Sequence, residues 1–308
     1  MTKLRLAIVG FGKIATVRHV PAIAAIPGIE LMAIADPKAK SPDVPNFPSL
    51  DALLREGPPI DAVTLCTPPQ VRSAQARLAL EAGKHVMLEK PPGATVSEIA
   101  PLLAAAQEVK RTLFATWHSR FAPAVEPARE LLASRSLKQV TITWKEDVRV
   151  WHPGQDWIFA AGGFGVFDPG INALSILTRI LPRPVFVTGA ELGFPANREA
   201  PIVVEMDMAD ATGLPVRAEF DFRQTGPQTW DIRIETDRGP IVISGGGARM
   251  SDGDKVVIDT TKEEYPALYR RFVGLASKGD CDVDLAPLQI VADALLLGRR
   301  RNVEAFEF

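Results

Sequence analysis

The chain has 308 residues, of which 46% are hydrophobic and 23% charged, and its formal net charge is −2. This composition is typical of a globular protein of about two domains, and it excludes the strongly basic surface of a nucleic-acid-binding protein. No apolar stretch reaches the roughly 20 residues of a membrane helix and the first residues show no signal-peptide pattern, so we expect a cytoplasmic protein that binds no membrane.

The first part of the chain, residues 1–120, alternates between short apolar segments and longer amphipathic ones. Alternation at this spacing is typical of crossover units, which build a parallel sheet with helices on both faces. We therefore predict a doubly wound Rossmann domain of the α/β class. The expected strands are residues 4–9, 31–35, 62–66, 85–88 and 113–115, the helices are 13–25, 50–55, 70–82 and 96–109, and a Pro-rich loop covers 37–48.

The second part, residues 121–308, is dominated by long β-type runs. Turns rich in Gly, Asp and Pro join the last four of these runs, which indicates an antiparallel meander. We predict an α+β domain with a large, mostly antiparallel sheet that binds the substrate. Its expected strands are residues 140–150, 185–193, 202–208, 216–222, 230–236 and 241–244, and its helices are 122–133, 172–180, 263–276 and 287–297.

A glycine motif, G-x-G-x-x-A, lies between the first predicted strand and the first predicted helix. Its first glycine permits a tight turn, its second lets the backbone approach a pyrophosphate, and its alanine allows close helix–strand packing. The helix N-terminus offers unpaired N–H groups to the phosphates. The motif therefore predicts a nicotinamide dinucleotide, NAD or NADP, contacted by Gly10, Phe11, Gly12, Lys13 and Ile14.

Asp36 ends the second predicted strand. A carboxylate there accepts hydrogen bonds from ribose hydroxyls and repels a 2′-phosphate, which favours NAD over NADP. A turn-capping role before Pro37 is the alternative, and Lys38 lies close enough to weaken the discrimination. Thr67 and Pro68 follow another strand at the same carboxyl edge, and we predict that they also contact the cofactor.

The sequence Glu89-Lys90-Pro91-Pro92 closes the strand predicted at 85–88. Together with the glycine motif it resembles the Gfo/Idh/MocA oxidoreductase family, and the resemblance covers essentially the whole chain. The Gly-rich run at 162–172 is similar to the second signature of that family, which ends in Asp-x-x-x-His. Three segments resemble the bacterial aldose 1-dehydrogenases of the family, which act on L-arabinose and D-galactose: Trp117-His118-Ser119-Arg120, Trp144-Lys145-Glu146-Asp147 and Trp151-His152-Pro153-Gly154.

This resemblance implies oxidation of a free aldopyranose at C1, with hydride transfer to NAD or NADP and an aldonolactone as product. It also implies a homodimer formed through the C-terminal sheet. A cyclic polyol (inositol) dehydrogenase and a non-catalytic sensor of NAD and sugar remain alternatives. D-galactose and L-arabinose differ by one exocyclic CH2OH, a difference worth only about 1–3 kcal/mol of binding, so the sequence does not separate them.

Two residues are the predicted catalytic groups. Lys90, which with Glu89 is expected beside the cofactor, would stabilise the developing alkoxide at O1. Asn172 stands where the family has its catalytic His, and an amide cannot take a proton, so Asp168 is the preferred acceptor. An N-cap for the helix predicted at 172–180 is the alternative role of Asp168.

Four residues are predicted to bind the sugar: His118, Glu146, Trp151 and Asn172. His118 would hold a hydroxyl or relay the proton, Trp151 would stack on the C–H face of the ring, and Asn172 offers both a donor and an acceptor. Glu146 shares a strand face with apolar neighbours, so it needs a polar partner such as a sugar hydroxyl. A salt bridge with Lys145 or Arg149 is the alternative.

No metal site is expected, because the four histidines are scattered and Cys66 and Cys281 lie far apart. The same separation gives no disulfide framework. The expected chemistry therefore depends on a nicotinamide and on protein side chains alone.

Overall fold

The computed structural model describes residues 3–261 and 263–308, and the chain divides into two compact units. The first unit contains the chain up to His118 together with Glu264–Asp284, and the second contains Ser119–Glu263 and Leu285–Phe308. The sequence pattern predicts a single boundary near residue 120, whereas the segment around Asp282 returns to pair with Phe114 of the first unit. Met1 and Thr2, which the predicted first domain includes, lie outside the described residues.

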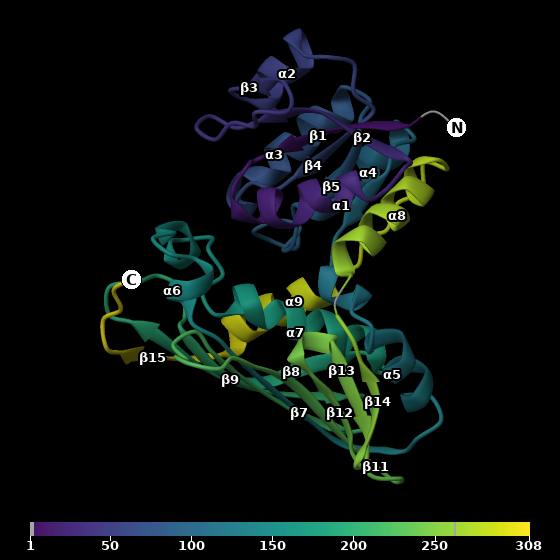
Figure 1. The fold of residues 1–308 in the computed structure, drawn as a ribbon. Coiled ribbons are helices and arrows are strands. Elements are labelled where there is room, and N and C mark those ends of the chain that lie inside the picture. The colour runs from purple at the N-terminus through teal and green to yellow at the C-terminus, as the bar shows by residue number, and fades with distance from the viewer. Residues whose placement is uncertain (1–2, 262) are drawn as a thin grey trace. The chain divides into compact units, whose positions relative to one another are not determined.

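Six parallel strands form the sheet of the first unit, in the order β3-β2-β1-β4-β5-β6 (Figure 1). The chain enters at the centre and moves outward in both directions, which is the predicted doubly wound arrangement. All residues of β4 are buried, as expected where helices cover both faces. The strands are β1 (Leu4–Val9), β2 (Ile29–Ala35), β3 (Asn46–Phe47), β4 (Ala62–Leu65), β5 (His85–Leu88) and β6 (Leu113–Ala115).

The helix predicted at residues 13–25 contains a π turn, in which the N–H of Val20 bonds the carbonyl of Ala15. Pro21 has no N–H to continue the ordinary α ladder, and the wider turn accommodates the missing donor. Helix α8 packs against α1, although about 240 residues separate them. The helices of this unit are η1 (Ala15–His19), α1 (Val20–Ala24), α2 (Leu50–Glu56), α3 (Pro69–Glu81), α4 (Ile99–Glu108) and α8 (Glu264–Ala276).

Nine strands form the sheet of the second unit, in the order β14-β13-β12-β11-β7-β10-β9-β8-β15. The predicted meander is wrong at one point, because β7 is inserted between β10 and β11 and runs parallel to β10. Strands β13, β14 and β15 escaped the sequence analysis. The strands are β7 (Leu137–Lys145), β8 (Val185–Pro195), β9 (Val203–Asp210), β10 (Pro215–Asp221), β11 (Thr229–Thr236), β12 (Ile241–Ser244), β13 (Arg249–Asp252), β14 (Lys255–Asp259) and β15 (Arg299–Val303).

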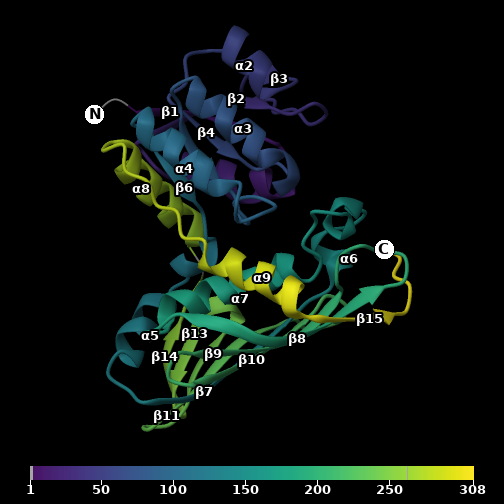
Figure 2. The ribbon, with the colours of Figure 1, turned by 180° about the vertical axis from the view of Figure 1, so that it is seen from behind.

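Helices α5, α7 and α9 lie along one face of this sheet (Figures 1 and 2). Gly170 lets α7 approach β10 closely, since a Cβ there would lie 2.6 Å from the ring of Phe220. No helix within residues 3–261 and 263–308 is long and apolar enough to cross a bilayer. The helices of this unit are η2 (His118–Phe121, which starts at the unit boundary), α5 (Val125–Leu132), α6 (Val148–Trp151), η3 (Asp156–Phe159), α7 (Phe167–Ile180), η4 (Gly245–Gly247) and α9 (Ala286–Leu297).

Two predicted boundaries in the second unit are wrong. The strand predicted at 140–150 ends at Lys145, because the Asp147 carboxylate caps α6 by accepting a hydrogen bond from the N–H of Arg149 at 2.9 Å. Helix α7 begins at Phe167 and not at residue 172, so Asp168 lies within its first turn. Asp168 is therefore not the N-cap, a position that Val166 occupies.

Candidate functional site

The glycine loop after β1 is shaped by two different constraints. Gly10 has φ +85°, and a Cβ there would lie 2.8 Å from the backbone nitrogen of Thr67, so the fold itself requires glycine. A Cβ at Gly12 would meet no atom of the described residues within 4 Å. Packing within the protein therefore does not require glycine at this exposed position. The absence of a side chain leaves the backbone open to the pyrophosphate of a dinucleotide.

The carboxylate of Asp36 ties this loop to the end of β2. Its Oδ2 accepts the N–H of Phe11 at 2.8 Å, and its Oδ1 accepts the N–H groups of Lys38 at 2.8 Å and Ala39 at 2.7 Å. Burial alone would raise the pKa of Asp36, but these backbone hydrogen bonds outweigh it and hold the pKa below its usual value. Asp36 therefore caps the turn that follows β2. Its Oδ2 keeps one lone pair that a ribose hydroxyl can use.

We expect Asp36→Ser to shift cofactor preference toward NADP, because it removes the negative charge that repels a 2′-phosphate. The ratio of kcat/KM for NADP to that for NAD should rise by at least about 10-fold, equivalent to about 1.4 kcal/mol. Asp43→Ser, in the loop that follows β2, is the matched control and should leave the ratio unchanged. A wild-type enzyme that strongly prefers NADP would contradict the role of Asp36.

Lys90 follows β5 at the carboxyl edge of the first sheet, and charged side chains hold its main chain on both sides. The Glu89 carboxylate accepts the N–H of Lys90 at 2.5 Å. The guanidinium of Arg72, which is only 3% exposed, donates to the carbonyls of Glu89 and Pro91 and to that of Thr67. Arg72 therefore joins the two loops predicted to contact the cofactor.

Arg72 was missed by the sequence analysis, although a signal existed. It lies on the face of α3 that also carries the buried residues Ala76, Ala79 and Leu80. A cation on the apolar face of an amphipathic helix needs buried acceptors, and here they are main-chain carbonyls.

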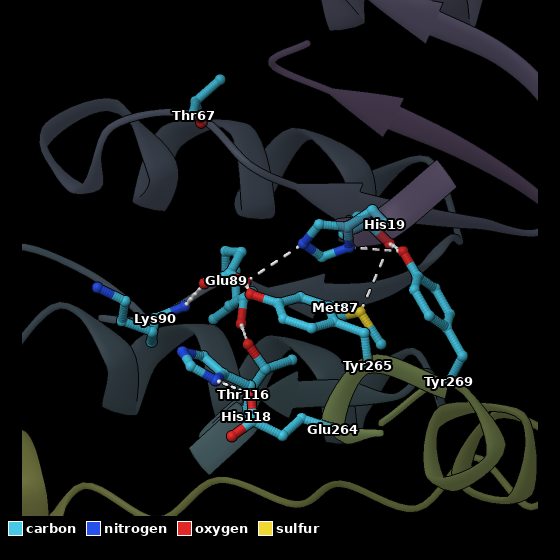
Figure 3. Close-up of polar contacts among 12 residues, drawn as sticks. His19, Thr67, Met87, Glu89, Lys90, Thr116, His118, Glu264, Tyr265 and Tyr269 are labelled. Atoms are coloured by element: carbon cyan, nitrogen blue, oxygen red, sulfur yellow. Dashed lines mark hydrogen bonds and ion pairs between the residues drawn. The ribbon is translucent and has the colours of Figure 1, made fainter. Parts of the chain in front are cut away.

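His118 and Glu89 have side-chain partners that the sequence did not indicate. The Nδ1 of His118 lies 3.0 Å from Glu264 Oε2, and its ring stacks on Tyr265 at 5.4 Å between centroids (Figure 3). Glu89 is 3% exposed, and its carboxylate points into the protein, toward His19 and Tyr265. Glu89 was predicted to contact the cofactor, and its buried partners His19 and Tyr265 were not predicted.

In the second unit, Glu146 contacts one member of a cluster of three tryptophans. Trp230 donates its Nε1–H to Glu146 Oε2 at 2.8 Å and packs against Trp151 and Trp144, with ring centroids 5.9 and 6.4 Å away. The two cations proposed as alternative partners of Glu146 are paired elsewhere, Lys145 with Glu219 and Arg149 with Asp147. A carboxylate beside indole rings is a combination suited to sugars, which present hydroxyls at their edges and C–H groups on their faces.

Asp168 lies 5% exposed in the first turn of α7, and its Oδ2 is 3.2 Å from Nε2 of His152. The Nδ1 of His152 faces Gln155 Oε1 at 3.3 Å, and the same oxygen accepts the indole N–H of Trp157 at 3.1 Å. The Gln155 amide oxygen can only accept hydrogen bonds, so the Nδ1 of His152 carries a proton in this contact. The Nε2 of His152 is then the atom that can exchange a proton with Asp168.

His152 is thus a site residue that the sequence analysis quoted within a motif but did not select. Asn172 lies one helical turn after Asp168, so the two side chains share a face of α7. No hydrogen bond of the Asn172 amide is found within the described part of the chain, which leaves both of its polar atoms available to a ligand.

Among residues 3–261 and 263–308, no three His, Cys, Asp or Glu side chains are grouped so that they could hold an ion. The glycine loop, Asp36 and the loops around Thr67 and Lys90 instead fit a dinucleotide, because they combine open backbone, a ribose acceptor and a cation at one sheet edge.

Comparison with known proteins agrees with this assignment. The model of the Gfo/Idh/MocA oxidoreductase family, with its NAD-binding Rossmann fold, matches residues 4–116. A galactose 1-dehydrogenase of Pseudomonas fluorescens is 47% identical over 99% of both chains. A D-glucoside 3-dehydrogenase of Escherichia coli (strain K12) is 29% identical over 59% of this chain and 55% of its own.

Solved structures extend the comparison. The D-galactose-1-dehydrogenase protein from Rhizobium etli has a TM-score of 0.95 and 55% identity, and the match covers 100% of this chain and 99% of that one. A 3-ketoreductase from Actinomadura kijaniata has a TM-score of 0.85 at 18% identity, with 98% and 100% coverage, and shares the fold.

Proposed function

The chain belongs to the Gfo/Idh/MocA oxidoreductase family, and we propose that it oxidises a free aldopyranose of the D-galactose type at C1 to the aldonolactone. The observation that carries this proposal is the match to galactose 1-dehydrogenases over nearly the whole length of both chains. When bound in the first unit, NAD or NADP would supply the acceptor for the hydride from C1. The charge of Asp36 supports a preference for NAD.

The residues of the first unit bind the cofactor and stabilise charge. Gly10, Phe11, Gly12, Lys13 and Ile14 would hold the pyrophosphate, while Thr67, Pro68 and Lys38 would line the rest of the dinucleotide. Lys90 would donate a hydrogen bond to O1 as the hydroxyl loses its proton, because a cation stabilises a developing alkoxide. His118 would contact a sugar hydroxyl.

The residues of the second unit bind the sugar and take its proton. Asp168 is the proposed acceptor, and its contact with His152 Nε2 provides a partner with which the proton can be shared. Glu146 would accept hydrogen bonds from ring hydroxyls, and the Asn172 amide would both accept and donate them. Trp151, packed on Trp230, would present an indole face to the C–H groups of the sugar.

A substrate panel tests this proposal. D-galactose, L-arabinose and myo-inositol are each offered with NAD and with NADP, and reduction is followed at the nicotinamide absorbance while NMR identifies the product. We expect both aldoses to give lactones, with kcat/KM values within about 200-fold of each other, since one hydroxymethyl contact is worth about 1–3 kcal/mol.

Two results of the panel would contradict the proposal. Oxidation of myo-inositol with inert aldoses would favour a polyol dehydrogenase. Binding of NAD and of a sugar, with no turnover of any substrate, would indicate a sensor.

We also propose a cytoplasmic homodimer formed through the sheet of the second unit. Several of the side chains that alternate with the buried ones on β9, β10 and β7 are charged, and two cross-strand pairs form among them, Arg217–Glu205 at 2.6 Å and Lys145–Glu219 at 2.8 Å. Such a mixed-charge face can be self-complementary in a two-fold interface. Light scattering of the purified protein would test the dimer.

A further inference from the structure

A cluster of polar side chains is buried in the first unit, outside the chemistry proposed above. His19 and Tyr265 contact Glu89, Tyr269 contacts His19, and each of the four side chains is at most 6% exposed (Figure 3). The tyrosines come from α8, His19 ends the π turn that follows the glycine loop, and Glu89 follows β5. Three segments distant in sequence therefore meet at one carboxylate.

The Glu89 carboxylate has three hydrogen-bond donors. Its Oε1 accepts the hydroxyl of Tyr265 at 2.7 Å and lies 3.2 Å from His19 Nε2, while its Oε2 accepts the N–H of Lys90 at 2.5 Å. Burial alone would raise the pKa of Glu89, but the hydrogen bond and the charge of His19 outweigh it and hold the pKa at about 2. Glu89 is therefore ionised at any pH at which the enzyme works.

His19 is the counter-charge of this carboxylate. Burial alone would lower the pKa of His19, but the neighbouring Cys66, Tyr269 and Glu89 outweigh it, and the pKa lies well above its usual value. The Nδ1 of His19 lies 2.8 Å from the hydroxyl of Tyr269, so both ring nitrogens have oxygen partners, as an imidazolium requires. The pair is a buried imidazolium–carboxylate.

Lys90 is the reason why this pair matters for function. Glu89 directly precedes Lys90, and its carboxylate accepts the main-chain N–H of Lys90. In Figure 3 the Lys90 side chain extends away from His19 and the tyrosines, while its N–H points to Glu89. The carboxylate thus holds the main chain of Lys90 while its own charge is balanced from inside the protein.

We propose that Glu89 and His19 are positioning residues for Lys90: the Glu89 carboxylate fixes the main chain of Lys90 through its N–H, and His19 holds that carboxylate in place and balances its charge from inside the protein. Tyr265 is a neutral third support. The inference rests on the proposed function in one respect, the participation of Lys90 in the reaction.

The pH dependence of variants distinguishes charge balance from packing. His19→Gln keeps a donor near Glu89 but removes the positive charge, so the pKa of Glu89 should rise and the carboxylate should protonate in the working range. We expect kcat to fall about 10-fold or more, because a displacement of about 1 Å at a reacting group can cost about 10²-fold. The acid limb of the kcat profile should move to higher pH. The charged and titratable groups around Glu89 are His19, Arg72, Lys90, His118 and Tyr265. Around His19, His118 and Tyr265 lie Cys66, Glu264 and Tyr269.

Three further variants make the test specific. Tyr265→Phe removes a neutral donor from the same carboxylate, so it should lower kcat less and leave the acid limb in place. His19→Gln combined with Glu89→Gln removes both charges and should recover part of the kcat lost in either single variant. Asp61→Asn, which breaks the ion pair with Arg5 in the same unit, should leave kcat unchanged. The melting temperature of each variant reports whether it is folded.

One measurement decides the inference without turnover. Nitrogen-15 NMR of the full chain should show both ring nitrogens of His19 protonated at pH 8. A neutral His19 at that pH, or a His19→Gln variant that is folded and has an unchanged kcat profile, would overturn the inference. Absence of aldose oxidation by the wild type would instead overturn the proposed function.

Discussion

Replacing Lys90 with alanine is expected to lower kcat by about 10²–10³-fold, the scale observed when one donor to a developing oxyanion is removed. Glu89 and Arg72 hold the main chain around Lys90, so alanine should leave the loop in place and remove only the ammonium. KM for the sugar should change far less than kcat, because the hydrogen bond to O1 strengthens only as the alkoxide forms.

Lys84 provides a matched control for this variant. Lys84 precedes β5 and Lys90 follows it, so the two cations stand at opposite ends of one strand, and the Lys84 ammonium donates to the carbonyl of Ile60. Lys84→Ala should keep kcat within about twofold of the wild type, an effect of at most about 0.4 kcal/mol. Lys90→Arg tests geometry, since the guanidinium retains the charge but not its position. Near-normal turnover in Lys90→Ala would remove Lys90 from the mechanism.

Replacing Asp168 with asparagine is expected to lower kcat by about 10²-fold or more, the usual contribution of a general base. The amide preserves the size of the side chain and its place in α7 but cannot accept the proton of the anomeric hydroxyl. Steady-state kinetics with D-galactose would measure the loss. Asp156→Asn, at an exposed carboxylate of η3, is the matched control and should leave kcat unchanged.

Comparison with neighbouring variants identifies the proton acceptor. His152→Gln removes the group that shares a proton with Asp168, so it should lower kcat and change the shape of its pH profile. Glu146→Gln should instead raise KM, as loss of uniform substrate binding does. Normal turnover in Asp168→Asn would exclude this residue as the base, and His152 and His118 would then be the candidates.

Local patterns predicted most of the first unit, and the reason is physical. Parallel strands buried on both faces are short continuous apolar runs, and the glycine motif marks the turn between β1 and the following helix. The second unit was predicted less well. β7 lies between β10 and β11, an arrangement that depends on pairing between residues 76 to 99 positions apart in the sequence, which alternation of apolar residues does not encode.

The predicted element boundaries around the candidate site were wrong for a related reason. Glu146, Asp147 and Val148 continue the alternation of β7, yet the strand stops at Lys145 because the side chain of Asp147 caps α6. Short polar side chains that bond to nearby backbone compete with the strand ladder, and periodicity does not detect that competition.

The sequence by itself determined the fold class and located the glycine loop, and it proposed Lys90 and Asp168 as the catalytic residues, because each of these inferences depends on residues close together along the chain. Only the tertiary structure revealed the partners: Arg72 beneath the loop of Lys90, His152 beside Asp168, and His19 opposite Glu89. A buried charge must find its partner wherever the fold brings one. In the case of Glu89 that partner lies 70 residues away, and the supporting hydroxyl of Tyr265 lies 176 residues away.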